Sequence, residues 1–105
     1  MNAKPVVLRD RAREDIEDAV EYYLGEAGSE VALTLIDAVE NALRTIADQP
    51  GVGSPRYAHE LGVPGLRSRP VGRFPYLIFY VDHEEEVDVW RVLHSARDIP
   101  ARMRE

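Results

Sequence analysis

Two stretches of the chain carry apolar residues at the spacing of one face of a helix. The first begins at Asp10, which can cap a helix, and the second runs from about Glu30 to Asp48. A short Gly25–Ser29 segment (GEAGS) separates them, so we expect an antiparallel helical hairpin. The two apolar stripes comprise Ala12, Ile16, Ala19, Val20, Tyr23 and Leu24, followed by Val31, Leu35, Ile36, Val39, Ala42, Leu43 and Ile46.

The C-terminal half changes to an alternation of period two, which is typical of strands. We expect strands over residues 66–69, 76–81 and 86–94, with a charged turn at 82–85. In the middle strand Tyr76, Ile78 and Tyr80 share one face. In the last strand, strict alternation groups Val87, Val89, Arg91 and Leu93 against Asp88, Trp90, Val92 and His94.

A short extended run, residues 4–9, precedes the first helix, and the element order is therefore β-α-α-β-β-β. This order predicts an α+β fold in which the helical hairpin packs on one face of a mainly antiparallel sheet. The length suits a single domain over residues 1–105. Residues 50–64, rich in Gly and Pro, are expected to form a connecting loop, and residues 99–105 a loosely ordered tail.

Composition limits the functional classes. The chain contains no cysteine, which excludes disulfides and favours a reducing cytoplasm. No apolar run is long enough to span a bilayer, so no membrane partner is expected. The net charge is −6, whereas residues 54–81 carry four arginines and one glutamate. Proteins that clamp nucleic acid are usually basic, so we expect no direct specific nucleic-acid binding by this chain alone.

No familiar catalytic or cofactor motif is present. The sequence has no glycine-rich phosphate loop, no HExxH and no GxSxG, and we expect no cofactor. His59, His83 and His94 fall on a loop, a turn and a strand end, so no metal site is expected either.

The candidate chemistry is confined to residues 65–98, the richest part of the chain in arginine, histidine and aromatic residues. Arginine binds phosphate in bidentate fashion and histidine can act as a general acid or base. These residues suit RNA cleavage, an anion-binding surface for a protein partner, or an ordinary polar sheet surface, and residue types alone leave the three open. The group comprises Arg67, Arg69, Arg73, Tyr80, His94, Arg97 and Asp98.

Three features resemble the RelE/ParE superfamily of toxins from bacterial type II toxin–antitoxin modules. They are the β-α-α-β-β-β order at this length, the helix exit IADQPGVGSP followed later by Leu66-Arg67, and the terminal strand VDVWRVLHSARD. The last resembles the RVLH ending of ParE-type members. The resemblance covers nearly the whole chain and implies a cognate antitoxin, whose N-terminal half binds DNA and whose C-terminal segment wraps the toxin.

The resemblance implies two alternative activities. ParE-type members inhibit DNA gyrase, whereas RelE-type members cleave mRNA in the ribosome with several basic residues and a C-terminal Tyr or His-Tyr pair. This chain has a single lysine, Lys4, and Ser95 follows His94. We therefore expect a ParE-like gyrase inhibitor with a ParD-like antitoxin, rather than an enzyme. The alternative is an mRNA endonuclease that uses Arg67, Arg69 and His94.

These expectations assign residues to two surfaces. Antitoxin contacts are expected from the helix stripes and the positive middle segment, at Ile16, Val20, Tyr23, Leu35, Val39, Leu43, Arg67 and Arg69. Contacts with the target are expected at Arg73, Tyr80, His94, Arg97 and Asp98.

Overall fold

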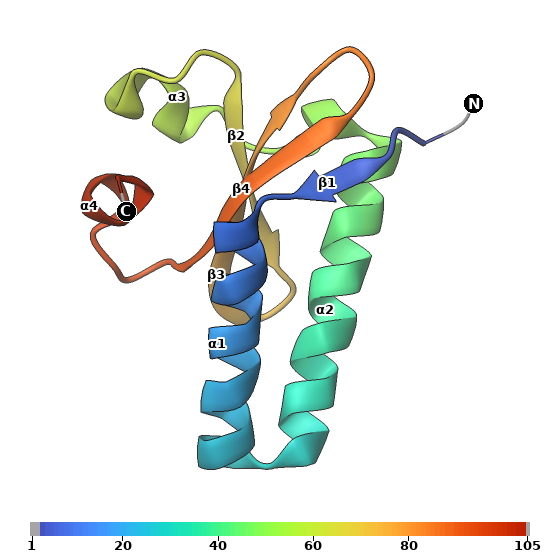
Figure 1. The fold of residues 1–105 in the computed structure, drawn as a ribbon, viewed down its shortest axis with the longest axis vertical. Helices are drawn as coiled ribbons and strands as arrows, with labels where there is room; N and C mark the ends of the chain where they lie inside the picture. The colour runs from blue at the N-terminus through green and yellow to red at the C-terminus, as the bar shows by residue number, and fades with distance from the viewer. Residues whose placement is uncertain (1–2, 105) are drawn as a thin grey trace.

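The computed structural model describes residues 3–104 and has the predicted α+β architecture (Figure 1). A helical hairpin covers one face of a four-stranded sheet, and two short helices lie over the other face. The elements are β1 (Val6–Leu8), α1 (Asp10–Ala27), α2 (Ser29–Asp48), the 3₁₀ turn η1 (Pro50–Val52), α3 (Arg56–Leu61), β2 (Leu66–Val71), β3 (Phe74–Asp82), β4 (Val87–His94) and α4 (Ile99–Met103).

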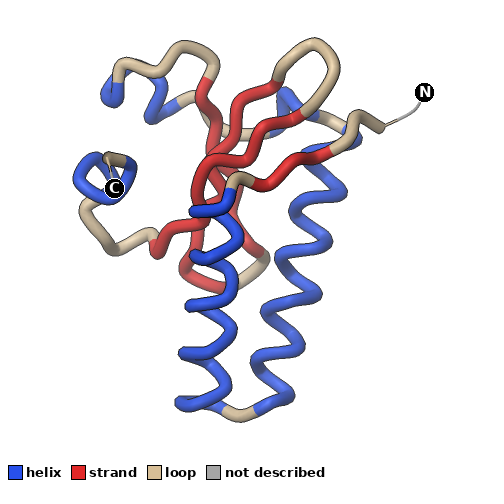
Figure 2. The backbone as a smooth tube through the Cα atoms, in the orientation of Figure 1, coloured by secondary structure: helices blue, strands red, loops and turns tan. Residues whose placement is uncertain are grey.

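The strands lie in the order β1-β4-β3-β2 (Figure 2). β2, β3 and β4 form an antiparallel meander, whereas β1 pairs in parallel with the first three residues of β4. Beyond this pairing the amide of Arg9 donates to the carbonyl of Val89, and the chain then leaves the sheet to start α1. The last part of β4 is therefore an edge of the sheet.

The helical hairpin forms as predicted. Gly28 joins α1 to α2 with φ of 92°, a conformation that favours glycine, and its amide donates to the carbonyl of Tyr23. Asp10 is the first residue of α1, and Arg9 rather than Asp10 occupies the N-cap position. The buried face of the hairpin packs on Ile78, Tyr80 and the valines of β4, and this cluster is the main core.

The opposite face of the sheet is covered, which corrects two predictions. Residues 50–64 are not a plain loop, because they include η1 and α3. Residues 99–103 are not a loose tail, because they form α4 with Ile99 buried. Phe79 and Leu93 are apolar on this face and need cover, which α3 and α4 provide. Residue 105 lies outside the described residues.

A β-bulge in β4 overturns the strict alternation predicted for this strand. Tyr80 lies opposite Val89 but Phe79 lies opposite Arg91, so Trp90 is an extra residue. After the bulge the faces exchange. Val92 joins Val87 and Val89 under the helices, while Trp90 and Leu93 lie on the second face. In β3 the predicted alternation holds, with Tyr76, Ile78 and Tyr80 toward the helices.

A buried ion pair joins α1 to the bulged strand. Nε and Nη2 of Arg91 donate to the two carboxylate oxygens of Asp15 at 2.7 and 2.9 Å, and the Val92 amide donates to the same carboxylate at 3.0 Å. Nη1 of Arg91 donates to the Arg102 carbonyl of α4. The side chains of Arg91 and Asp15 are only 6% and 12% exposed, so this pair links three elements away from water.

A second, more exposed group fastens β1 to β4. The Arg9 guanidinium donates to both oxygens of Asp88 and lies 4.2 Å from the centre of the Trp90 ring. The Trp90 indole also donates to Asp88. Partial burial acts to raise the pKa of Asp88, but the hydrogen bonds from Arg9 and Trp90, the charge of Arg9 and His83 together hold that pKa below its usual value.

We expect Arg91→Met to lower the free energy of unfolding by about 3 kcal/mol, because it leaves the Asp15 carboxylate buried without its counter-charge. Denaturant titration followed by circular dichroism measures this change. The matched control is Arg73→Met, whose side chain is exposed at a turn. Adding Asp15→Asn to Arg91→Met should restore part of the loss, since a neutral amide is cheaper to bury. A single variant as stable as its control would contradict the role given to the pair.

We expect Asp88→Asn to make the free energy of unfolding depend less steeply on pH under acidic conditions. The pKa of Asp88 is lower in the folded than in the unfolded chain, so its stabilisation is present above the unfolded pKa and is lost as the pH falls through the folded pKa. Unfolding titrations between about pH 5 and pH 2 should show a smaller slope for the variant. Glu84→Gln, at an exposed turn, is the control, and equal slopes for all three proteins would refute the assignment.

Candidate functional site

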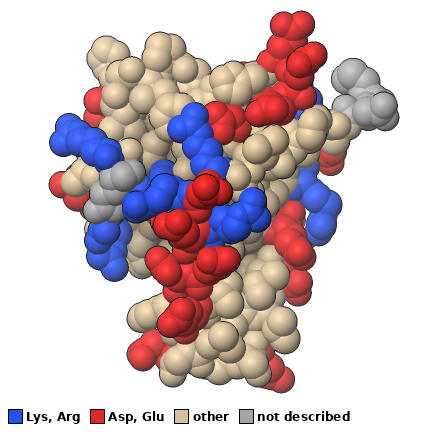
Figure 3. Space-filling view, viewed as in Figure 1, with Lys and Arg blue, Asp and Glu red and all other residues tan. Residues whose placement is uncertain are grey.

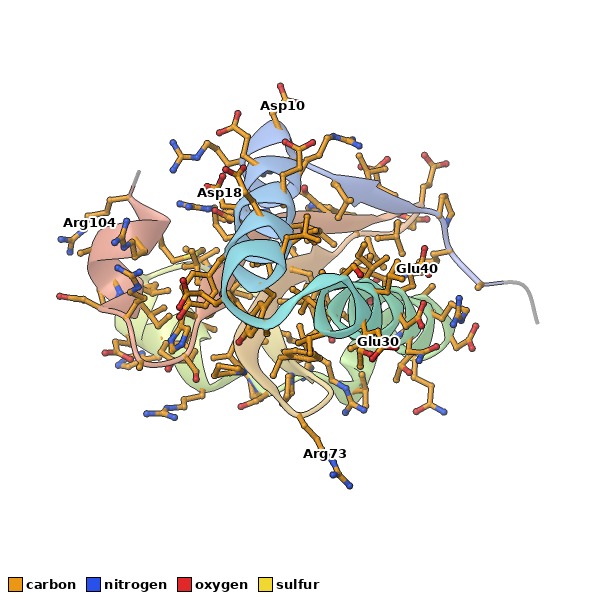
Figure 4. All side chains as sticks on the ribbon, turned by 90° about the horizontal axis from the view of Figure 1, so that it is seen from below. Asp10, Asp18, Glu30, Glu40, Arg73 and Arg104 are labelled. Carbon is orange, nitrogen blue, oxygen red and sulfur yellow. The ribbon has the colours of Figure 1, made fainter. Side chains whose placement is uncertain are left out.

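A groove of about 540 Å³ lies between α1 and the end of β4. Asp18 and Tyr22 of α1 form one wall, and Arg97 and α4 lie across from them. Figure 4 places Asp18 on the side of α1 that faces α4. β1 pairs with only the first part of β4, so it does not cover this part of the strand. The groove follows the unpaired edge of the strand.

Aromatic rings form the floor of the groove. The rings of Tyr22 and Tyr23 meet edge to face at 5.2 Å, and Tyr23 lies 6.4 Å from Tyr76. The ring of Tyr76 contacts that of His94 at 5.3 Å. Burial raises the pKa of Tyr76, as do the neighbouring Tyr23 and Tyr22, while the charge of Arg97 acts in the opposite direction. Such a floor suits apolar and aromatic side chains of a partner.

His94 and its neighbours close the end of the groove. The Nδ1 atom of His94 accepts a hydrogen bond from the Ala96 amide at 3.1 Å, which leaves Nε2 as the ring nitrogen available to a partner. The exposed Arg97 has no ion pair among residues 3–104. Asp98 instead serves the fold, because its carboxylate accepts from the Ala101 amide and caps α4. Of the target-contact candidates, His94 and Arg97 share this site.

Tyr80 and Arg67 belong to a different, structural cluster. Tyr80 is fully buried, and its hydroxyl donates to the Pro50 carbonyl at 2.7 Å and accepts from the Gly53 amide at 2.9 Å. Burial raises the pKa of Tyr80, partly offset by the Gly53 hydrogen bond and the charge of Arg67. Arg67 donates to the Gly53 carbonyl. The expectation that Tyr80 contacts a target is therefore wrong, because no partner can reach it.

The three residues named for RNA cleavage do not converge. Arg67 lies opposite Tyr80 and Arg69 opposite Ile78, whereas His94 lies opposite Tyr76. Arg67 and His94 are thus on opposite sides of β3 and four residues apart along it, about 13 Å at the usual rise per residue. Arg73 is at the tip of the β2–β3 turn, where Figure 4 shows it pointing away from the body of the protein.

The helix stripes predicted to bind a partner are mostly core. Leu35 and Val39 are 2% and 5% exposed and face the sheet, so neither is open to an antitoxin in this structure. This corrects their assignment as contact residues, because the sheet already occupies the face that the stripe offers. Ile16, Val20, Tyr23 and Leu43 are half-buried at the margins of the same core.

Sequence reasoning missed most of the groove. Asp15, Asp18, Tyr22 and Tyr76 were not assigned to a site, although all four line it. A signal for one of them was available: Asp15 falls three residues after Ala12 and four before Ala19, on the helix face that is buried. An acid on such a face, together with the lone Arg91 in an apolar strand, points to a buried pair.

Charge is distributed unevenly around the groove. In Figure 3 acidic side chains follow the solvent face of α1, and basic side chains flank them. The exposed acids of α1 are Asp10, Glu14, Glu17, Asp18, Glu21 and Glu26. Within residues 3–104, no three side chains of the kinds that bind metals gather into a possible site. None of the helices in this range is long and apolar enough to cross a membrane.

Comparison with known proteins places the chain in a family. The family model described as "ParE toxin of type II toxin-antitoxin system, parDE" matches residues 6–99. The chain belongs to the ParE toxin family. A solved structure titled "Chromosomal ParDE TA system from P. aeruginosa" shares the fold, with a TM-score of 0.73 and 19% identity over 88% of this chain and 96% of that chain. A search of curated proteins gives no match.

Membership confirms the predicted resemblance and implies an antitoxin partner. It also sets the groove in context, since a ParE-family chain works as one half of a toxin–antitoxin pair. The groove is open, lined by aromatic and charged side chains, and bordered by an unpaired strand edge. These properties suit a polypeptide ligand better than a small cofactor.

We expect Tyr80→Phe to lower the free energy of unfolding by about 2 kcal/mol, because the Gly53 amide and the Pro50 carbonyl both lose their partner. Thermal and denaturant unfolding measure the loss. Tyr22→Phe removes a hydroxyl from a side chain that is 58% exposed and should change stability by less than about 0.5 kcal/mol. Equal stability of the two variants would show that the Tyr80 hydroxyl is not a structural anchor.

Proposed function

We propose that this ParE-family chain is a cytoplasmic toxin that inhibits DNA gyrase and is neutralised by a ParD-like antitoxin with a DNA-binding N-terminal half. The match to the ParE toxin model over residues 6–99 is the observation that carries this proposal. The chain acts as a protein inhibitor rather than as an enzyme. Its contact with gyrase is made by exposed residues at one end of the β2–β3–β4 meander.

The separation of Arg67 from His94 supports an inhibitor over a nuclease. General acid–base cleavage needs its groups within hydrogen-bond reach of one reacting site. Arg67 is also held by the Gly53 carbonyl, on the far side of β3 from His94. An mRNA endonuclease that uses Arg67, Arg69 and His94 is the alternative function, and the register of the sheet weighs against it.

Gyrase contact is assigned to the candidates that remain exposed. Arg73 projects from the β2–β3 turn, and Arg97 lies beside the half-buried His94 at the end of the groove. Neither arginine has an ion pair among the described residues. Unpaired surface arginines of this kind are common anchors in protein interfaces.

The antitoxin is assigned to the margins of the hairpin and to the arginines of β2. Ile16, Val20, Tyr23 and Leu43 keep partial exposure, as do Arg67 and Arg69. A partner that crosses the groove covers Tyr23 together with His94 and Arg97. An antitoxin bound there would therefore also block the proposed gyrase contact, which gives neutralisation a simple steric basis.

We expect the purified chain to block DNA supercoiling by gyrase or to trap cleaved DNA. Arg73→Glu and Arg97→Glu should each reduce the potency by about tenfold, because each removes a charge at the interface and introduces repulsion. Arg56→Glu, on α3, is the charge-matched control. Agarose-gel assays of relaxed plasmid over a range of toxin concentrations give the measurement.

Two outcomes would contradict this function. One is unchanged supercoiling at a large molar excess of toxin. The other is codon-positioned cutting of a translated message that disappears in His94→Ala, which primer extension detects and which would favour the endonuclease.

A further inference from the structure

The two sides of the sheet differ in how their outer strands are protected. On the β2 side, Ser54 and Ser68 exchange amide-to-carbonyl hydrogen bonds of 2.8 and 2.9 Å. Pro70, also in β2, has no amide hydrogen to offer. This side of the sheet is therefore closed to another strand. On the opposite side of the sheet, β1 covers only the first three residues of β4, and the rest of β4 forms the edge.

The register of β4 with β3 shows which backbone groups of β4 point away from β3. The Ser95 amide donates to the Pro75 carbonyl, so Pro75 and Ser95 form a hydrogen-bonded pair, and such pairs alternate with non-bonded pairs along an antiparallel ladder. The register then makes Ile78–Val92 and Tyr76–His94 non-bonded pairs. Val92 and His94 therefore direct both of their backbone polar groups outward, toward the groove.

Two of these four outward groups already have partners. The Val92 amide donates to the Asp15 carboxylate, and the His94 carbonyl accepts from the Arg97 amide. In the described part of the chain, no hydrogen bond uses the Val92 carbonyl or the His94 amide. One acceptor and one donor thus stand unpaired at the sheet edge, two residues apart, in a groove of 540 Å³.

This pair of free groups selects the direction of an added strand. A residue of an antiparallel strand exchanges both of its hydrogen bonds with one residue opposite, and Val92 and His94 each retain only one free group. A residue of a parallel strand donates to one residue and accepts from the residue two positions later. That arrangement matches the Val92 carbonyl and the His94 amide, and it repeats the way Val7 of β1 lies opposite Asp88 between Val87 and Val89.

We propose that the groove binds an extended segment of the antitoxin as a strand parallel to β4, in line with β1. This inference rests on the proposed function, which supplies an antitoxin as the partner. One residue of the segment lies opposite Leu93, donates to the Val92 carbonyl and accepts from the His94 amide. Its two neighbours face α1, because side chains alternate along a strand, and they pack on Ala19, Tyr22 and Tyr76.

Charge defines the segment further. Arg97 lines the groove without an ion pair among residues 3–104, and Asp15 is already taken by Arg91. The segment therefore carries apolar residues toward the tyrosines and a carboxylate toward Arg97. An acidic and apolar sequence of this kind gains affinity from main-chain hydrogen bonds and specificity from the alternate side chains.

The experiment uses the full chain and the protein encoded in the reading frame beside it, purified together and separately. Amide hydrogen exchange followed by NMR compares the free toxin with the complex. The His94 amide should exchange at least about tenfold more slowly in the complex, since it gains a hydrogen bond and loses contact with water. The Glu84 amide, in the exposed β3–β4 turn, is the internal control and should not change.

Variants separate the backbone contact from the side chain. His94→Pro removes the amide donor, whereas His94→Ala removes the ring and keeps the donor. His94→Pro should bind the antitoxin about fivefold more weakly than His94→Ala. Arg97→Glu should weaken binding by about tenfold at low salt and by less at high salt, and Arg56→Glu should have no effect. Hydrogen exchange on the natural sequence decides the question if His94→Pro does not fold.

The possible failures are distinct. If the complex forms but the His94 amide exchanges as in the free toxin, the strand proposal is overturned and an antitoxin partner stands. If protection extends to His94 but His94→Pro binds like His94→Ala, the donor role is overturned. If no complex forms with the neighbouring protein, the proposed function fails and the strand proposal falls with it.

Discussion

The Asp15 carboxylate is the group on which the arrangement of helix, sheet and C-terminal segment depends. It accepts from the guanidinium of Arg91 and from the amide of Val92, and Arg91 in turn donates to a carbonyl of α4. Burying a carboxylate this deeply lowers the stability of the fold unless a counter-charge is bound to it. With Arg91 bound, the carboxylate holds α1, β4 and α4 in fixed relative positions. The pair sets where α1 crosses β4, and hence where the groove opens.

The Asp15 carboxylate also provides a hydrogen bond that a neighbouring strand would normally provide to β4. The bulge at Trp90 turns the Val92 amide outward at a point where β1 has already left the sheet. Without a partner this amide would be a buried, unpaired donor, which proteins rarely tolerate. The Asp15 side chain of α1 accepts the hydrogen bond of this amide, as a carbonyl of a neighbouring strand would. The rest of the edge, from the Val92 carbonyl to the His94 amide, is left for another molecule.

The regular elements were predictable because local pattern decides them. The stripe with Ala12 and Ala19 in α1 and the stripe with Val39 in α2 specified the hairpin, and the alternation from Tyr76 to Tyr80 specified which face of β3 meets it. Both are periodic patterns of side-chain burial. Where one face of an element is buried along its whole length, the sequence must repeat with the period of that element.

The features that failed depend on contacts between distant residues. The bulge at Trp90 is one inserted residue, and nothing local in VDVWRVLH distinguishes it from strict alternation. α4 has only five residues and is held by burial of Ile99 against the sheet, so its sequence reads as a polar tail. The role of Tyr80 was misjudged for the same reason, since its partners Pro50 and Gly53 lie in a segment that reads as a loop.

The arginines divide according to what holds them, and this division argues for a binding surface. Arg67 and Arg91 donate to backbone carbonyls of the chain itself, and Arg9 is paired with Asp88. These three arginines therefore join segments of the chain that lie far apart in the sequence. Arg73, in the turn before β3, and Arg97, just after β4, lie near the same end of the meander, and neither has an ion pair in residues 3–104. A nuclease would need its cations gathered around one phosphate, whereas two unpaired arginines on a broad, aromatic-lined surface suit recognition of another protein.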